Sequence, residues 1–91
     1  MTIEERLKQM LIGAGMRDED AEKVMLTAKP ELEKLPIFAG IIANKTWNGL
    51  AKGYPEMVFN SLWYRLKEIA LEWVQQNKPE TWYRPIFENL D

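Results

Sequence analysis

The segment from Pro55 to Asn77 carries an apolar surface that is too wide for one neighbouring helix to cover. On a helical wheel its apolar side chains span about 160°, more than the stripe of an ordinary surface helix. These side chains are Val58, Phe59, Leu62, Trp63, Leu66, Ile69, Ala70, Trp73 and Val74. Proline suits the first helical position, and Pro79 follows Asn77 as a stop signal. We therefore predict a central helix over residues 55–77 that packs against several neighbours.

The length of the chain allows one hydrophobic core. A chain of 91 residues buries enough surface for a single core and not for two. Hydrophobic residues make up 46% and charged residues 29% of the chain, which is typical of a folded domain rather than a disordered one. We predict that residues 1–91 form one all-α domain, a small bundle of three to four helices around the central helix.

Residues 2–14 have the pattern of an amphipathic helix. Thr2 and Glu5 have the spacing of a capping box, and Gly13 and Gly15 are typical of a helix end. The apolar side chains that fall on one face are Ile3, Leu7, Met10, Leu11 and Ala14. We therefore predict that this helix packs on the central one.

A second helix is expected to begin with Asp18 as its N-cap, because Asp is a favoured capping residue. Its apolar stripe is Ala21, Val24, Met25, Ala28, Leu32 and Leu35. Proline in a helix interior removes a hydrogen bond and clashes with the preceding turn. Pro30 therefore predicts either a break near Lys29, followed by a short helix to Leu35, or one kinked helix.

Two segments show no clear period. We expect residues 36–53 to form a buried short helix or a compact loop rather than a strand, because a lone strand would have no partner in this chain. The tail from Pro79 to Asp91 is rich in aromatic residues. Its large apolar side chains, Trp82, Tyr83, Ile86 and Phe87, predict that it folds back onto the bundle.

The composition argues against an enzyme. The chain has no Cys and no His, which excludes thiol chemistry, disulfides and every triad that depends on histidine. Ser61 is the only serine and has no histidine to activate it. The acidic run Asp18-Glu19-Asp20 lies on successive helical positions, whose side chains diverge and cannot converge on a metal ion. Each Asp and Glu is predicted on a polar face or near a helix end. We predict no catalytic residue, no metal site and no cofactor.

Charge and hydropathy weigh against nucleic acid and membrane as partners. The net charge is −2, so the chain has no basic field to attract phosphate. Residues 2–28 could form a helix-turn-helix, but the acidic first turn of its second helix would repel DNA. The longest apolar run, Ile37 to Ala43, is shorter than a membrane span, and the N-terminus does not resemble a secretory signal. We therefore expect a cytoplasmic location.

Three apolar side chains interrupt the polar side of the central helix. Met57, Tyr64 and Leu71 recur every seven residues, which places them within about 40° of one line. Large apolar groups in register on a solvated face are typical of a contact surface. The alternative is that the tail or residues 36–53 cover them. We predict that these residues bind a protein partner or a second copy of the chain.

Short motifs in the C-terminal half resemble those of small uncharacterised proteins encoded by tailed bacteriophages and prophages. The motifs are Gly53-Tyr54-Pro55, Leu62-Trp63, Ala70-Leu71-Glu72-Trp73, Asn77-Lys78-Pro79 and Trp82-Tyr83-Arg84-Pro85-Ile86-Phe87. The resemblance implies an accessory protein in the cytosol of a bacterial host, and it implies no active residue.

These observations favour a non-enzymatic interaction or accessory protein that docks through a helix face. Two alternatives remain from the sequence. The first is a structural protein of virion assembly, such as a head or tail completion protein, which would form a ring. The second is a nucleic-acid binder, which the acidic charge disfavours.

Overall fold

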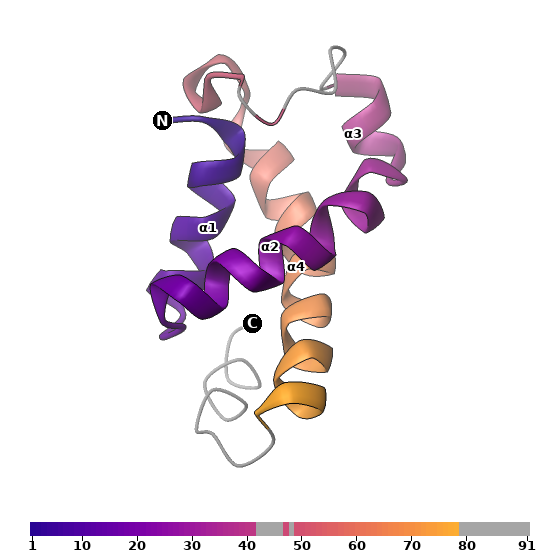
Figure 1. The fold of residues 1–91 in the computed structure, drawn as a ribbon. Helices are drawn as coiled ribbons and strands as arrows, with labels where there is room; N and C mark the ends of the chain where they lie inside the picture. Colours follow the sequence, from indigo (N-terminus) through magenta and orange to yellow (C-terminus); the bar gives the residue numbers. More distant parts are fainter. Residues whose placement is uncertain (42–46, 48, 79–91) are drawn as a thin grey trace.

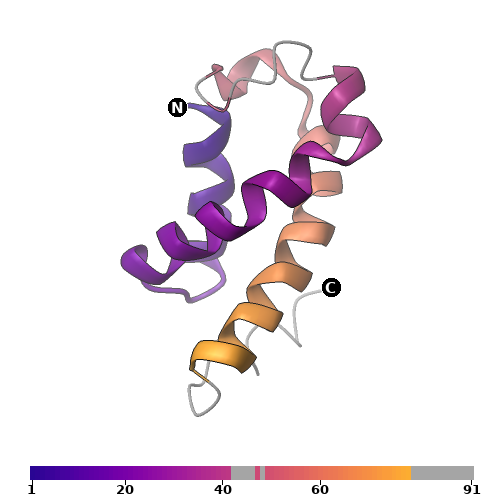
Figure 2. The same ribbon diagram turned by 45° about the vertical axis from the view of Figure 1, so that its right-hand side comes forward.

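The described residues of this computed structural model, 1–41, 47 and 49–78, form a bundle of four α-helices with one short 3-10 turn. The elements are α1 (Ile3–Gly13), α2 (Asp18–Glu33), α3 (Pro36–Ile41), η1 (Ala51–Gly53) and α4 (Glu56–Asn77). α2 crosses in front of α1 and α4 in Figure 1, and Figure 2 shows the same crossing from another side. The predicted all-α fold is confirmed.

The long helix at 55–77 is also confirmed, with its start moved by one residue. Pro55 is the N-cap of α4 and Glu56 its first residue. α4 packs against α1, α2 and α3, as its broad apolar surface requires. Its buried side chains are Val58, Phe59, Leu62, Leu66, Ile69, Ala70 and Val74. Trp63 and Trp73 lie half-buried at the edges of this surface and pack against the core.

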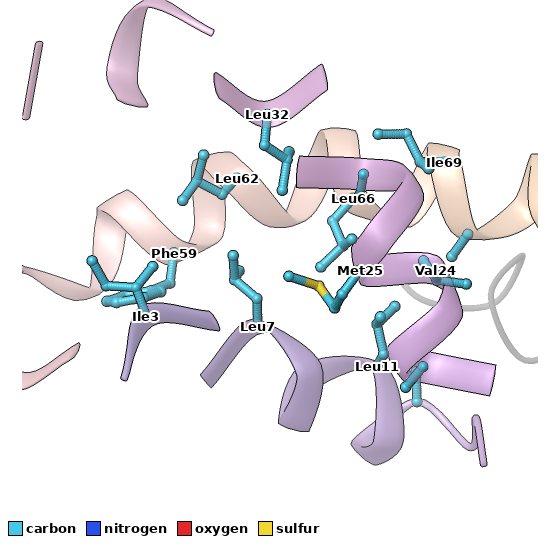
Figure 3. Packing of buried hydrophobic residues seen from close by; sticks show 14 of the residues in the cluster. Ile3, Leu7, Leu11, Val24, Met25, Leu32, Phe59, Leu62, Leu66 and Ile69 are labelled. Carbon is cyan, nitrogen blue, oxygen red and sulfur yellow. The ribbon is translucent and has the colours of Figure 1, made fainter. Parts of the chain in front are cut away.

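The core forms where α1, α2 and α4 meet. Leu7 and Leu11 of α1 and Met25 of α2 point toward Leu66 of α4 in Figure 3. All four side chains are at most 1% exposed. Full burial of an aliphatic side chain of this size stabilises the folded state by about 1.5–3 kcal/mol. The stripes predicted for the first two helices and the central helix therefore meet in one core.

α1 begins and ends as the capping signals predict. The Glu5 backbone N–H donates to Thr2 Oγ1 (3.1 Å), and the Thr2 backbone N–H donates to Glu5 Oε1 (2.9 Å), which completes the capping box. At the other end Gly15 has φ 107°, in the left-handed region that glycine adopts without steric cost. The reversal at Gly15 directs the chain into α2.

The prediction that Asp18 caps α2 is wrong. Arg17 is the N-cap, in extended conformation, and no side chain caps this end by a hydrogen bond. Asp18 is already helical, since the Ala21 backbone N–H donates to the Arg17 carbonyl (2.8 Å). The carboxylates of the first turn still favour this helix end through the macrodipole.

Pro30 does not end α2. Of the two predicted outcomes, a break near Lys29 is wrong and a single helix that runs to Glu33 is found. Ala28 and Leu32, on either side of the proline, are both fully buried, while Pro30 itself is exposed. Packing on both sides of the proline thus offsets the lost hydrogen bond.

The N-terminus pairs with a distant part of the chain. The Ile3 backbone N–H donates to the Gly49 carbonyl (2.8 Å), Glu4 N–H to the Trp47 carbonyl (3.1 Å) and Ala51 N–H to the Met1 carbonyl (2.9 Å). The first two bonds satisfy first-turn N–H groups of α1 that have no partner within the helix. Residues 36–53 were predicted as a short helix or a compact loop, and residues 36–41 of this segment form the short helix α3. The tail at 79–91, predicted to fold back onto the bundle, lies outside the described residues.

The capping box predicts a response to acid. The hydrogen bonds with the backbone and side chain of Thr2 lower the pKa of the Glu5 carboxyl below its ordinary 4.5. A lowered folded-state pKa contributes stability above the unfolded pKa, and this contribution is lost as pH falls through the folded value. Glu5→Gln keeps a side chain that can complete the box but cannot titrate. Urea unfolding measures the free energy of unfolding at pH 6 and again below pH 4. The decrease between the two pH values should be smaller for Glu5→Gln than for the wild type. An equal loss would contradict this assignment.

Candidate interaction surface

The side of α4 turned away from its buried residues is the candidate surface. We call it the outward face, and it consists of Met57, Asn60, Ser61, Tyr64, Lys67, Glu68 and Leu71. Met57 is 63% and Tyr64 69% exposed, so the structure places both predicted residues in solvent. Leu71 differs, because it is half-buried and packs against the core. Only part of the Leu71 side chain can therefore contribute to a contact.

Local contacts order the outward face. Ser61 Oγ donates to the Met57 carbonyl one turn earlier (2.9 Å). The Lys67 ammonium lies 5.5 Å from the centre of the Tyr64 ring, within range of a cation–π interaction. At the edge of the face, the Arg65 guanidinium lies 3.6 Å from a carboxylate oxygen of Glu68 and 3.6 Å from one of Glu31 on α2. The arrangement exposes an aromatic ring and a thioether side chain among charges of both signs. Such a surface is suited to packing against a partner rather than to catalysis.

Other large apolar side chains are also exposed. They are Met1 (66%), Leu26 (65%) and Leu50 (59%). Leu26 stands on the solvent side of α2, and Met1 and Leu50 belong to the segments that pair at the N-terminus. No pattern in the sequence marks these three residues. Unlike Met57 and Tyr64, they do not recur along one helix face, and single exposed apolar residues are normal on a soluble domain.

An ion pair between a buried carboxylate and a partly exposed lysine connects the first turn of α2 to the end of α4. Asp20 is 1% exposed, and its two carboxylate oxygens accept hydrogen bonds from Lys78 Nζ at 3.0 and 2.9 Å. Asp20 meets the prediction that each acidic residue lies on a polar face or near a helix end, because it belongs to the first turn of α2. The prediction did not anticipate that its side chain lies on the buried face. Its position four residues before Val24, in phase with the apolar stripe, is the signal that could have revealed this.

Neither metal-ligand clusters nor membrane spans are found in the part of the chain that the structure describes. Among residues 1–41, 47 and 49–78, no three acidic side chains converge as metal ligands would. Asp18 and Glu19 are exposed, and Asp18 pairs with Lys8 of α1 at 3.2 Å. Over the same residues, every helix is too short or too polar to cross a bilayer.

Comparisons with known proteins give no family. No protein-family model matches the chain. No curated protein and no solved structure is significantly similar to it.

Proposed function

We propose that the chain is a small non-enzymatic interaction protein that docks through the outward face of α4. The observation that supports it is the exposure of Met57 and Tyr64, one above the other on a helix whose opposite side forms the core. Aromatic residues and methionine are enriched in protein interfaces. Moving these side chains from water into a contact would contribute about 1.5–3 kcal/mol each at full burial.

A bacteriophage or prophage origin is part of this proposal. It rests on the aromatic and proline motifs of the C-terminal half, which resemble those of small phage-encoded proteins. In that setting the chain acts as an accessory protein in the host cytosol. A ring-forming role in the virion is the alternative, and a large assembly in sedimentation would favour it.

Substitution of both exposed residues should leave the fold intact. Changing Met57→Lys together with Tyr64→Glu is expected to alter the free energy of unfolding by less than about 1 kcal/mol, because exposed positions away from special features tolerate change. Urea unfolding followed by circular dichroism measures this. A loss of several kcal/mol would show that the two side chains belong to the core and that the docking surface does not exist.

A photo-crosslinking residue at position 64 tests docking in cells that encode the chain. The replacement of Tyr64 with benzoyl-phenylalanine should give a discrete adduct on illumination, and the matched replacement of the exposed Gln9 on α1 should give none. The added substitution Met57→Lys should abolish the adduct without unfolding the chain. Absence of any adduct, or identical adducts from both positions, would contradict the proposed function.

A further inference from the structure

The outward face of α4 is complementary to itself when a second copy lies antiparallel to it. Met57 and Leu71 are equally far from Tyr64, seven residues on either side. A two-fold axis at Tyr64 therefore sets each Tyr64 against its own copy and each Met57 against Leu71 of the second copy. In this register all three apolar side chains of one helix meet apolar side chains of the other.

The charges of the face agree with the same register. At 100° per residue, Asn60 and Lys67 lie on one flank of the line through Tyr64, and Ser61 and Glu68 lie on the other. The two-fold axis brings each flank against the same flank of the second copy. Lys67 then lies across from Asn60, and Glu68 lies across from Ser61. Each of these two charges faces a neutral group that can hydrogen-bond to it. Arg65, at the edge of the face, lies near its own copy, and its charge is paired within each chain with Glu31 and Glu68.

The outward face carries little net charge, which fits a second copy better than a strongly charged partner. Lys67 and Glu68 cancel, and the exposed Glu72 just beyond Leu71 adds one negative charge. The whole chain carries a net charge of −2, so repulsion between two copies is small. The balance of charge on the face and on the chain therefore permits self-association at ordinary salt concentrations.

We propose that two copies of this chain associate through the outward faces of α4 as an antiparallel, two-fold symmetric dimer with Tyr64 at the axis. This inference rests on the proposed function and names its partner. Met57 to Leu71 spans about 21 Å of helix. One pair of helices of this length buries less than the roughly 800 Å² per partner of a stable interface. The dimer is therefore weak, with a dissociation constant in the micromolar to millimolar range.

Sedimentation equilibrium of the full chain measures the association. The average mass should rise from monomer toward dimer as the concentration increases to about 1 mM, the region where weak complexes form. Tyr64→Lys should remove the rise. Leu26→Lys, at an equally exposed leucine on α2, should retain it. A chain that stays monomeric over this range overturns the inference, as does an association that Tyr64→Lys leaves unchanged.

Single cysteines test the antiparallel arrangement, because the natural chain has none. In the proposed register the two copies of position 61 are about 9 Å apart along the helices, and the two copies of position 75 about 33 Å apart. A short bis-maleimide should therefore link Ser61→Cys into a dimer and leave Gln75→Cys monomeric. Both positions are exposed. Equal linking of the two variants, or linking of Gln75→Cys alone, overturns the register.

The outcomes separate this inference from the function on which it rests. A monomeric chain that still forms a photo-adduct with a different protein through position 64 retains the docking function and loses the dimer. A monomeric chain that forms no photo-adduct loses both. A photo-adduct of twice the chain mass, with linking at Ser61→Cys, supports both.

Discussion

Leu66→Ala is expected to lower the free energy of unfolding by about 2–5 kcal/mol, the range for removing a buried leucine side chain and leaving a cavity. Leu66 is fully buried where α1, α2 and α4 meet, opposite Leu7 and Met25 (Figure 3). A small domain has about 5–15 kcal/mol of total stability, so the variant loses a large part of it. Its melting temperature should fall by about 10 °C or more.

The matched control for Leu66→Ala is Tyr64→Ala, two residues earlier on the same helix. Tyr64 is 69% exposed, and its truncation should change stability by about 0.5 kcal/mol or less. Thermal and urea unfolding of the two variants measure both effects. Similar losses at the two positions would show that α4 does not have one buried and one exposed side.

Lys78→Met is expected to destabilise the protein by about 1–3 kcal/mol, the cost of removing a charged hydrogen-bond donor from a buried acceptor. The substitution keeps an unbranched side chain up to the ε position and removes the ammonium group that donates to both oxygens of Asp20. A fully buried pair would lose about 3–5 kcal/mol. Lys78 is 34% exposed, so water screens part of the interaction and the loss is smaller.

The matched control for Lys78→Met is Lys34→Met. The Lys34 ammonium lies 3.8 Å from Glu31, and its side chain is 73% exposed. Exposed ion pairs contribute little, so this variant should change stability by less than about 0.5 kcal/mol. Urea unfolding at pH 7 compares the two. An equal change in the free energy of unfolding for both substitutions would mean that the burial of Asp20 does not make its ion pair more stabilising than an exposed one.

Local patterns predicted α1, α2 and α4 because each of these three helices carries its own periodic apolar stripe. The stripe of α1 meets the broad face of α4 as its spacing requires, and Thr2 and Glu5 make the predicted capping box. At Pro30 the pattern left two outcomes open. The choice between them depends on how Ala28 and Leu32 pack against the rest of the bundle, which a one-dimensional pattern does not contain.

Contacts between distant segments could not be predicted from the sequence. The pairing of residues 1–4 with residues 47 and 49–51 uses backbone groups, which every residue has, so no side-chain pattern marks it. The burial of Asp20 depends on Lys78, which lies 58 positions later.

The candidate site was predicted in part. Spacing placed Met57 and Tyr64 on the exposed side of α4 correctly, because that side follows from the position of the core. The same spacing gave no means to foresee that Leu71 packs partly against the core.

One side of α4 forms the core while the opposite side is open to solvent, and both the fold and the docking surface depend on this division. The reaction rate of a thiol reagent with single cysteines tests it in dilute folded protein, where self-association is negligible. Tyr64→Cys should react about as fast as the same variant in urea, since position 64 is exposed. Leu66→Cys should react far more slowly when folded than in urea, because a buried thiol reacts only when the structure opens. Strong protection of Tyr64→Cys from the thiol reagent in the dilute folded protein would show that this side of α4 is not open to solvent.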